Sequence, residues 1–160
     1  MTGHPLTPDL ETLHGTCVAI DGAGVLILGP PGAGKSDLAL RLIDEAGSGI
    51  SGRPKVAKLV SDDQVVVRRR GRELFASPPA GIAGKLEIRG QGIVELPHAS
   101  EVVLRLCVKL VPAAAIERMP EPGSSGHVIL GIVLAQVDID PLVPSAAARV
   151  RAAVDGLSAS

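Results

Sequence analysis

The residues best suited to chemistry lie in the stretch GPPGAGKS, which runs from Gly29 to Ser36. It fits the pattern GxxxxGK[ST] at every fixed position, and this pattern is typical of a loop that wraps the phosphates of a nucleotide. In such a loop the glycines turn backbone N–H groups toward the β-phosphate, the lysine reaches the β- and γ-phosphate oxygens, and the serine hydroxyl joins a magnesium shell. The predicted nucleotide-binding set is Gly29, Pro30, Pro31, Gly32, Ala33, Gly34, Lys35 and Ser36.

The flanking residues supply the strand and the helix that this loop requires. TCVAI and VLIL are short β-branched and aliphatic runs joined by a turn at Asp21-Gly22, which predicts two strands. After the loop, SDLALRLIDEA places Leu38 and Leu42 at helical spacing, and Gly47 is the expected stop. A phosphate bound here would also meet the partial positive charge of the helix N-terminus.

Two adjacent carboxylates, Asp62 and Asp63, follow the short apolar run KLV. Phosphoryl transfer to a hydroxyl needs carboxylates for magnesium and a base for the proton. If KLV forms a strand beside the one that enters the loop, both carboxylates fall near the γ-phosphate, because ligands gather at the carboxyl ends of parallel strands. Adjacent side chains point in opposite directions, so we expect one acid to serve the nucleotide and the other a structural partner; the alternative is a plain turn.

Three further polar features stay open on spacing alone. Alternation in LEIRGQG puts Glu87 and Arg89 on one face, which suits a metal ligand beside a phosphate clamp and equally suits an exposed ion pair. His14 precedes a strand, where it is either a surface residue or an imidazole that orients a carboxylate. The arginines at positions 68–70 and 72 fall at an expected hairpin tip, so we leave them out of the site.

The composition predicts a single domain of the α/β class. We interpret residues 1–13 as a lead-in and residues 14–160 as one P-loop domain with a central β-sheet flanked by helices. One aromatic residue, Phe75, and 16 basic against 17 acidic residues argue against a nucleic-acid partner. No run approaches the ~18 apolar residues of a membrane helix, and two isolated cysteines suit a reducing cytosol, so we expect a cytoplasmic protein with ordinary core thiols.

Several classes of nucleotide-binding protein are disfavoured by what the sequence lacks. It contains no [NT]KxD, the guanine-specific signature of regulatory GTPases, and it is short for a motor or transporter ATPase. Small-molecule kinases usually need a lid with several arginines, whereas Arg118 is the single candidate between Lys109 and Arg149. This favours a large substrate that closes the site itself. A small-molecule P-loop kinase and a non-catalytic nucleotide-sensing module remain the alternatives.

The order of these motifs resembles the catalytic C-terminal domain of the bacterial HPr kinase/phosphorylase family. HG, a strand pair, GxxGxGKS, a strand ending in DD and LEIRGQGIVEL follow one another between about His14 and Pro144. The chain looks like the short form known from alphaproteobacteria, which lacks the N-terminal domain of longer members. LEIRGxGI is the most specific element. Its signature segment comprises Leu86, Glu87, Ile88, Arg89, Gly90, Gln91, Gly92, Ile93, Val94 and Glu95.

The resemblance implies ATP-dependent phosphorylation, with magnesium, of a serine in the phosphocarrier protein HPr, a step in the regulation of carbohydrate metabolism. It implies that Lys35 contributes to catalysis, that Ser36 and Glu87 ligate magnesium, and that Asp63 accepts the proton of the serine hydroxyl. Asp62 would be the supporting carboxylate. His14 matches the family's active-site histidine, and Arg118 falls where the family has an active-site arginine. Longer members are hexamers, so a homo-oligomer is one expectation.

Two departures from the family pattern carry expectations of their own. The stretch GSGISGRPK, residues 47–55, is an apparent insertion that we interpret as a flexible surface loop. In PLVPSA, residues 141–146, Val143 and Ala146 replace two arginines that the longer members carry in PVRPGR. There the segment supports phosphorolysis of phosphoserine, and loss of two cations from an anion-binding segment should weaken that step. The resemblance therefore predicts a kinase with reduced or absent phosphorylase activity.

Overall fold

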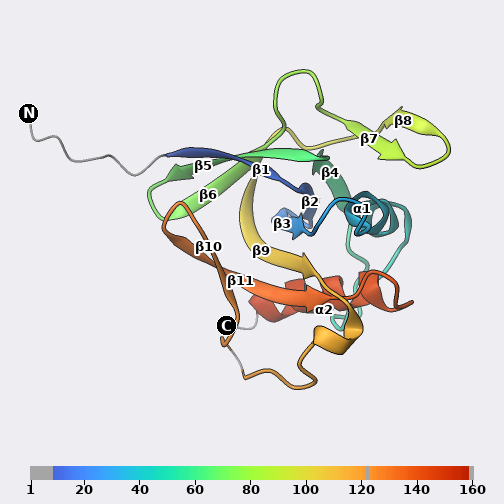
Figure 1. The fold of residues 1–160 in the computed structure, drawn as a ribbon, viewed down its shortest axis with the longest axis vertical. Coiled ribbons are helices and arrows are strands. Elements are labelled where there is room, and N and C mark those ends of the chain that lie inside the picture. The colour runs from blue at the N-terminus through green and yellow to red at the C-terminus, as the bar shows by residue number, and fades with distance from the viewer. Residues whose placement is uncertain (1–8, 122, 159–160) are drawn as a thin grey trace, which may run out of the picture.

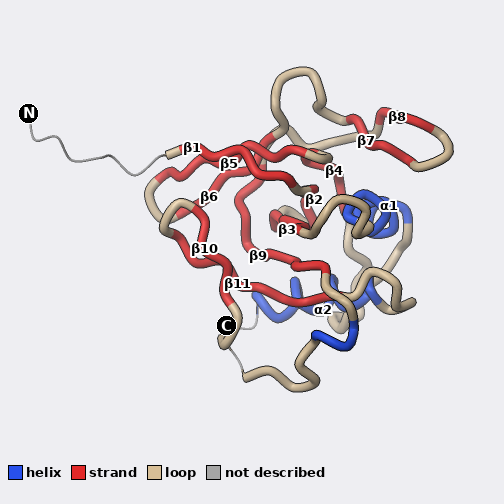
Figure 2. Tube along the Cα trace, in the orientation of Figure 1, coloured by secondary structure: helices blue, strands red, loops and turns tan. Residues whose placement is uncertain are grey.

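The computed structural model describes residues 9–121 and 123–158, which form a mixed β-sheet with two α-helices (Figures 1 and 2). The first strands are β1 (Leu10–His14), β2 (Thr16–Ile20), β3 (Ala23–Leu28), β4 (Ala57–Ser61), β5 (Gln64–Arg70) and β6 (Glu73–Ser77). The others are β7 (Lys85–Ile88), β8 (Gly92–Glu95), β9 (Val102–Leu110), β10 (Gly126–Ile129) and β11 (Ile132–Ile139). The helices are α1 (Lys35–Asp44) and α2 (Ala146–Ser158), with a 3-10 turn η1 (Ala113–Ala115).

Nine of the strands form one sheet. Seven of them follow the order β1-β5-β6-β9-β3-β2-β4, and the other two branch from it, because β11 pairs with β9 and β10 pairs with β11. The long strand β9 pairs with β3 on one side, in parallel. Its other side pairs with β6 near its start, antiparallel, and with β11 near its end, in parallel. The predicted β2–β3 hairpin is confirmed, with Asp21 and Gly22 both at positive φ in a two-residue turn.

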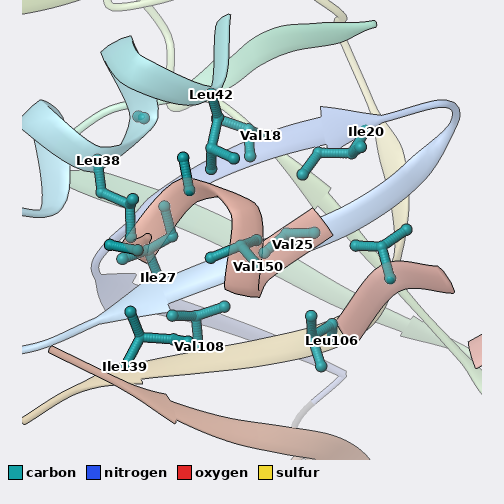
Figure 3. Packing of buried hydrophobic residues seen from close by; sticks show 14 of the residues in the cluster. Val18, Ile20, Val25, Ile27, Leu38, Leu42, Leu106, Val108, Ile139 and Val150 are labelled. Carbon is teal, nitrogen blue, oxygen red and sulfur yellow. The ribbon is translucent and has the colours of Figure 1, made fainter. Parts of the chain in front are cut away.

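The helices cover one face of this sheet, and strands cover the other. Leu38 and Leu42 of α1 and Val150 of α2 pack against side chains of β2, β3, β9 and β11 in an outer cluster (Figure 3). Val65, Val67 and Leu74 of β5 and β6 pack against the opposite face in an inner cluster. Both clusters are aliphatic, as the composition requires, and together they make the predicted α/β fold. No helix among residues 9–121 and 123–158 is long and apolar enough to span a membrane.

The ordered chain starts earlier than the predicted lead-in allows. Residues 1–8 lie outside the described part, but β1 begins at Leu10 and pairs antiparallel with β5 over its whole length. Leu13 packs against the inner cluster, which gives this edge strand an apolar anchor. The expectation that ordered structure begins near His14 was therefore wrong by about one strand.

The strand that leads to the paired carboxylates is not the neighbour of the strand that enters the loop. β4 pairs with β2, and β2 in turn pairs with β3, both antiparallel. Because two antiparallel pairings restore the direction, β4 runs parallel to β3. Its carboxyl end, with Asp62 and Asp63, therefore lies at the same edge of the sheet as the phosphate loop, which is the outcome that the sequence argument required.

The segment LEIRGQGIVEL forms a hairpin rather than a single strand-like element. β7 and β8 pair with each other in a separate two-stranded sheet, and Gly90 in the turn and Gly92 at the start of β8 take positive φ angles of 87° and 96°. Leu86 is fully buried and fixes the hairpin to the body of the protein, where β7 contacts α1. Figure 1 shows the hairpin projecting beside α1. The two glycines mark a turn because L-residues rarely adopt such angles.

The predicted flexible loop of residues 47–55 is exposed over most of its length but anchored on α2. Lys55 is buried and forms an ion pair with Asp155 of that helix. The backbone N–H of Ile50 donates to Asp155 Oδ2 at 2.8 Å, and the N–H of Lys55 donates to the carbonyl of Gly47 at 2.9 Å. These contacts close the loop on itself and on α2, so the expected surface loop is tied to the body of the protein at both of these points.

Candidate active site

The phosphate loop lies between the end of β3 and the start of α1, as its sequence predicts. Gly32 and Gly34 have φ angles of 78° and 103°, a conformation that favours glycine. A Cβ on Gly29 would lie 3.1 Å from Leu110 Cβ and 3.2 Å from Ala33 Cβ, so the loop passes close to the end of β9. Glycine at these three positions therefore follows from the loop's geometry, and α1 directs its N-terminus at the site.

Lys35 spans the loop that precedes it. Its ammonium group donates to the carbonyls of Gly29 at 2.8 Å and of Pro30 at 3.1 Å. These bonds hold the positive charge over the curve of the loop, beside the first turn of α1. A cation fixed in that place suits the phosphate-binding role that the motif predicts for it.

Asp62 is the hub of a buried hydrogen-bond network. Its side chain is 7% exposed. Its Oδ1 accepts hydrogen bonds from Ser36 Oγ at 2.7 Å and from Thr16 Oγ1 at 2.9 Å. Its Oδ2 accepts one from the backbone N–H of Glu87 at 3.2 Å. One carboxylate thus connects the phosphate loop, the strand β2 and the hairpin β7–β8.

Asp63 faces the other way and is exposed, as expected for the neighbour of a buried acid. Its φ is 68°, and the N–H of Gln64 donates to the carbonyl of Asp62 at 2.8 Å, which closes a tight three-residue turn with Asp63 at its centre. The Gly15 N–H donates to the Asp63 carbonyl at 3.0 Å, and Ser61 Oγ donates to the Gln64 carbonyl at 2.5 Å. Such strained residues persist where their surroundings hold them, and they cluster at functional sites.

A cleft of about 430 Å³ collects these groups. It is lined by Thr16, Pro31, Gly32, Gly34, Lys35, Ser36, Asp37, Leu40, Asp63, Glu87, Ile88 and Arg89. The structure therefore brings five of the eight loop residues together with Asp63, Glu87 and Arg89, although they come from three separate stretches of chain. Two other surface hollows, of about 470 and 700 Å³, contain no residue of the phosphate loop, so chemistry rather than size identifies the cleft.

Two of the four residues predicted to be catalytic, His14 and Arg118, do not line this cleft. His14 is an exposed residue at the end of β1. The backbone N–H of the next residue, Gly15, donates to the backbone carbonyl of Asp63. Arg118 is exposed in the segment between β9 and β10, drawn in orange at the bottom of Figure 1, while β7–β8 lies at the top. The roles of these two residues stay predictions that follow from the family resemblance alone.

Sequence reasoning did not assign Thr16, Gly15 and Ser61 to the site, nor Asp37 and Leu40, which also line the cleft. Thr16 is fully buried in a strand of apolar residues, and a lone hydroxyl in such a run was the available signal, because buried polar groups need partners. A Cβ on Gly15 would lie 3.0 Å from the Ile27 carbonyl oxygen, so the β1–β2 junction crosses β3 too closely for a side chain. The hydrogen bond from Ser61 Oγ to the Gln64 carbonyl depends on the tight turn at Asp63, and the spacing of residues in the sequence does not predict this turn.

The donor set fits a nucleotide with magnesium. Magnesium in such sites takes one or two carboxylates, phosphate oxygens and waters rather than a dedicated protein cage. The described residues contain no cluster of three or more His, Cys, Asp or Glu that could hold a metal by itself. The Ser36 hydroxyl, already bonded to a buried carboxylate, and the Glu87 side chain at the cleft are the oxygen ligands that this arrangement offers.

The two cysteines lie away from this chemistry. Cys17 and Cys107 are fully buried in the inner cluster, and both are free thiols. Burial raises the pKa of Cys17 far above its ordinary value. Burial, with a smaller contribution from the charge of Asp138, raises the pKa of Cys107 to about 12. Neither thiol ionises near neutral pH, so the prediction of ordinary core thiols is confirmed.

Comparison with known proteins identifies the family of the chain. Residues 6–140 match the family model described as HPr Serine kinase C-terminal domain. The chain is 39% identical over 92 residues to an HPr kinase/phosphorylase of Clostridium tetani and 35% identical over 97 residues to one of Mycoplasmopsis pulmonis. These matches cover 58% and 59% of this chain but only 27% and 28% of the relatives, so the chain spans a small part of their length.

A solved structure extends the likeness to nearly the whole chain. The HPr(Ser) kinase/phosphatase from Coxiella burnetii superimposes with a TM-score of 0.72 at 25% identity, covering 93% of this chain and 97% of that one. The solved structure thus shares the fold, and residues 6–140, which the family model matches, contain the phosphate loop, the paired carboxylates and the hairpin β7–β8. The chain therefore belongs to the HPr serine kinase C-terminal domain family.

Proposed function

We propose that this protein transfers the γ-phosphate of ATP to a serine of the phosphocarrier protein HPr. The observation that carries the proposal is the single cleft that holds Lys35 and Ser36 of the phosphate loop together with the exposed carboxylate of Asp63. A loop for the donor and a base for the acceptor are the two parts that phosphoryl transfer to a hydroxyl needs. Membership of a serine kinase family implies ATP as the phosphate donor.

Each group has a distinct task in this proposal. The amides of the loop and the ammonium of Lys35 bind and orient the phosphates, while Asp63 accepts the proton as the serine oxygen bonds to phosphorus and ADP leaves. Ser36 and Glu87 would hold magnesium. Magnesium, when bound, neutralises charge on the β- and γ-phosphate oxygens. Asp62 keeps Ser36 in place through its 2.7 Å hydrogen bond.

The strained turn supports the role of Asp63 as the base. A carboxylate that merely ended the strand could adopt a relaxed turn, whereas Asp63 is held at φ 68° by bonds from Gly15 and from the Ser61–Gln64 clamp. This geometry keeps the carboxylate exposed at the cleft while its neighbour is buried. A positioned base of this kind contributes roughly 10²- to 10⁴-fold to proton-transfer steps.

One experiment separates this function from its alternatives. Purified protein is incubated with labelled ATP and HPr, with a serine-to-alanine HPr variant as the control. Label on wild-type HPr alone supports the proposal. Label on neither protein, with tight ATP binding, favours a nucleotide-sensing module, and consumption of ATP only with added metabolites favours a small-molecule kinase.

The proposal includes a weak or absent reverse reaction. Pro141 lies beside the phosphate loop, because a Cβ on Gly34 would lie 3.5 Å from its Cβ, so the segment PLVPSA borders the site. Yet Val143 packs against the outer cluster and Ala146 is fully buried, so neither position offers a cation to inorganic phosphate. Phosphoserine-HPr should be lost at the same rate with and without added phosphate. Robust formation of pyrophosphate would contradict this part of the proposal.

The remaining predictions concern the setting of the enzyme. A cytoplasmic location is proposed because the substrate, HPr, is expected there, and fractionation of cells that produce a tagged protein would test it. A homo-oligomer also stays a prediction, for which sedimentation of the purified chain is the measurement. Neither prediction affects the assignment of the cleft.

A further inference from the structure

Thr16 is a fully buried polar residue of the sheet. It opens β2, a strand whose other four residues are buried and apolar, and its own side chain is fully buried. A hydroxyl in such a place is costly unless it is hydrogen-bonded. Its partner is Asp62 Oδ1, at 2.9 Å, the same oxygen that accepts the hydrogen bond of Ser36.

Asp62 connects two proposed magnesium ligands through this one carboxylate. Oδ1 holds the hydroxyl of Ser36, and Oδ2 holds the backbone N–H of Glu87. Ser36 belongs to α1 and Glu87 to β7, two elements far apart in the sequence. A rotation of the Asp62 carboxylate would therefore change the position of both. Of the three residues that donate to Asp62, Ser36 and Glu87 are proposed magnesium ligands. Thr16 is not, and its hydrogen bond limits this rotation.

We propose that Thr16 is a positioning residue, which fixes the Asp62 carboxylate and thereby holds Ser36 and the Glu87 segment at the spacing that nucleotide-bound magnesium requires. This inference rests on the proposed nucleotide and magnesium site but not on the identity of the phosphate acceptor. Hydrogen bonds to a charged acceptor are short and about twice as strong as neutral ones, so loss of one should loosen the carboxylate measurably.

The test uses substitutions that separate the hydroxyl from the shape of the side chain. Thr16→Val keeps the volume and removes the donor, while Thr16→Ser keeps the donor. Thr12→Val is the matched control, because Thr12 is exposed on the edge strand β1. If Thr16→Val does not fold, Thr16→Cys replaces it, because a thiol is only a weak hydrogen-bond donor.

Two readouts report on the two arms of the network. The first is hydrogen exchange of the Glu87 amide in the protein without nucleotide, which monitors the Oδ2 arm. The second is the affinity for ADP and ATP with and without magnesium, which monitors the Oδ1 arm through Ser36. For Thr16→Val we expect about tenfold faster exchange at Glu87 and about a tenfold loss of the magnesium-dependent gain in affinity. Affinity without magnesium should change less than twofold, and Thr16→Ser and Thr12→Val should match the wild type.

Three results would overturn the inference. One is a magnesium dependence and a Glu87 exchange rate that Thr16→Val leaves unchanged. Another is faster exchange over the whole sheet, or a Thr16→Ser variant that behaves like Thr16→Val, since either indicates a merely structural role. The third is a wild-type protein that binds nucleotide without any magnesium dependence. Failure to phosphorylate HPr, by contrast, refutes the proposed acceptor and leaves these readouts intact.

Discussion

Charged side chains lie near both ends of α1, but they differ in their surroundings and in their proposed roles. At the N-terminal end, Lys35 and Ser36 open onto the cleft, and the exposed carboxylates of Asp63 and Glu87 lie across it. At the C-terminal end, beyond Asp44, the charged side chains of Arg151 and Lys55 are paired and buried. The helix dipole makes the first end attractive to phosphate and the second to a cation.

Arg151 of α2 is that cation. Its side chain is 4% exposed, and its Nη2 donates to the carbonyls of Glu45 at 2.7 Å and of Leu42 at 3.4 Å. These are backbone acceptors that a helix end leaves without intrahelical partners. Gly47 leaves room for the guanidinium, since a Cβ there would approach Arg151 Nη1 to 2.3 Å. The nearby Lys55–Asp155 ion pair fastens the following loop to the same helix.

The difference teaches how this small domain divides its charges between stability and function. Groups that hold the fold are paired with a partner that satisfies them, as Arg151 is with carbonyls and Lys55 with Asp155. Groups assigned to chemistry face the cleft, and Asp63 is additionally held in a strained conformation. Substitutions at the two ends should therefore separate activity from stability.

The largest effect is expected at the cleft. Asp63→Asn keeps the size and the tolerance for positive φ but removes the base, so phosphate transfer to HPr should fall by about 10²- to 10⁴-fold. Nucleotide affinity should stay within about threefold, because the loop is untouched. Transfer rates from labelled ATP and equilibrium nucleotide binding measure the two. Transfer at the wild-type rate would refute the role of Asp63.

The opposite pattern is expected from Arg151→Met at the far end of α1. Removal of the guanidinium leaves the carbonyls of Leu42 and Glu45 without their charged donor, which should lower the free energy of unfolding by about 1 to 3 kcal/mol. The rate of transfer at a temperature where the variant is folded should change less than twofold. Urea unfolding of this variant and of Arg149→Met, an exposed control on the same helix, gives the comparison. Equal stability of the two variants would contradict it.

A smaller effect of opposite sign is expected from Asp63→Gly. Glycine adopts positive φ without the steric cost of a Cβ, so the variant should gain about 0.5 to 1 kcal/mol in stability while transfer is lost. Asp63→Asn serves as the control, because it removes the same charge without relieving the backbone. Thermal unfolding of both variants measures the difference. A glycine variant less stable than the asparagine variant would show that the turn is unstrained.

The smallest effect concerns pH at the paired end. The hydrogen bond from Lys55, with one from the Ile50 N–H, lowers the pKa of Asp155 below its usual value. A lowered pKa in the folded state adds stability above the ordinary carboxyl pKa of about 3.9, and this stability disappears as the pH falls through the folded value. The difference in Tm between wild type and Asp155→Asn should therefore be largest near neutral pH and shrink below about pH 4. A difference independent of pH would contradict the pairing.

Much of the fold followed from local pattern. The β2–β3 hairpin, the loop and α1 are specified by β-branched runs, an Asp-Gly turn and leucines at helical spacing, all within about thirty residues. Features that local pattern did not predict depend on partners far away in the chain. β1 is held by β5, and the loop of residues 47–55 is held by α2. The local propensities of the residues do not predict such long-range pairings.

The sequence by itself determined which groups are available for the proposed chemistry: a phosphate loop, a pair of carboxylates and a signature segment, because residue types and spacing decide which groups could bind phosphate and move a proton. Only the tertiary structure decided how they divide the work. It buried Asp62 against Thr16 and Ser36, left Asp63 exposed in its tight turn, and turned the signature segment back on itself beside α1. These choices arise where the β2 and β4 strands, α1 and the hairpin meet, since burial and hydrogen bonding between distant segments exist only in the folded chain.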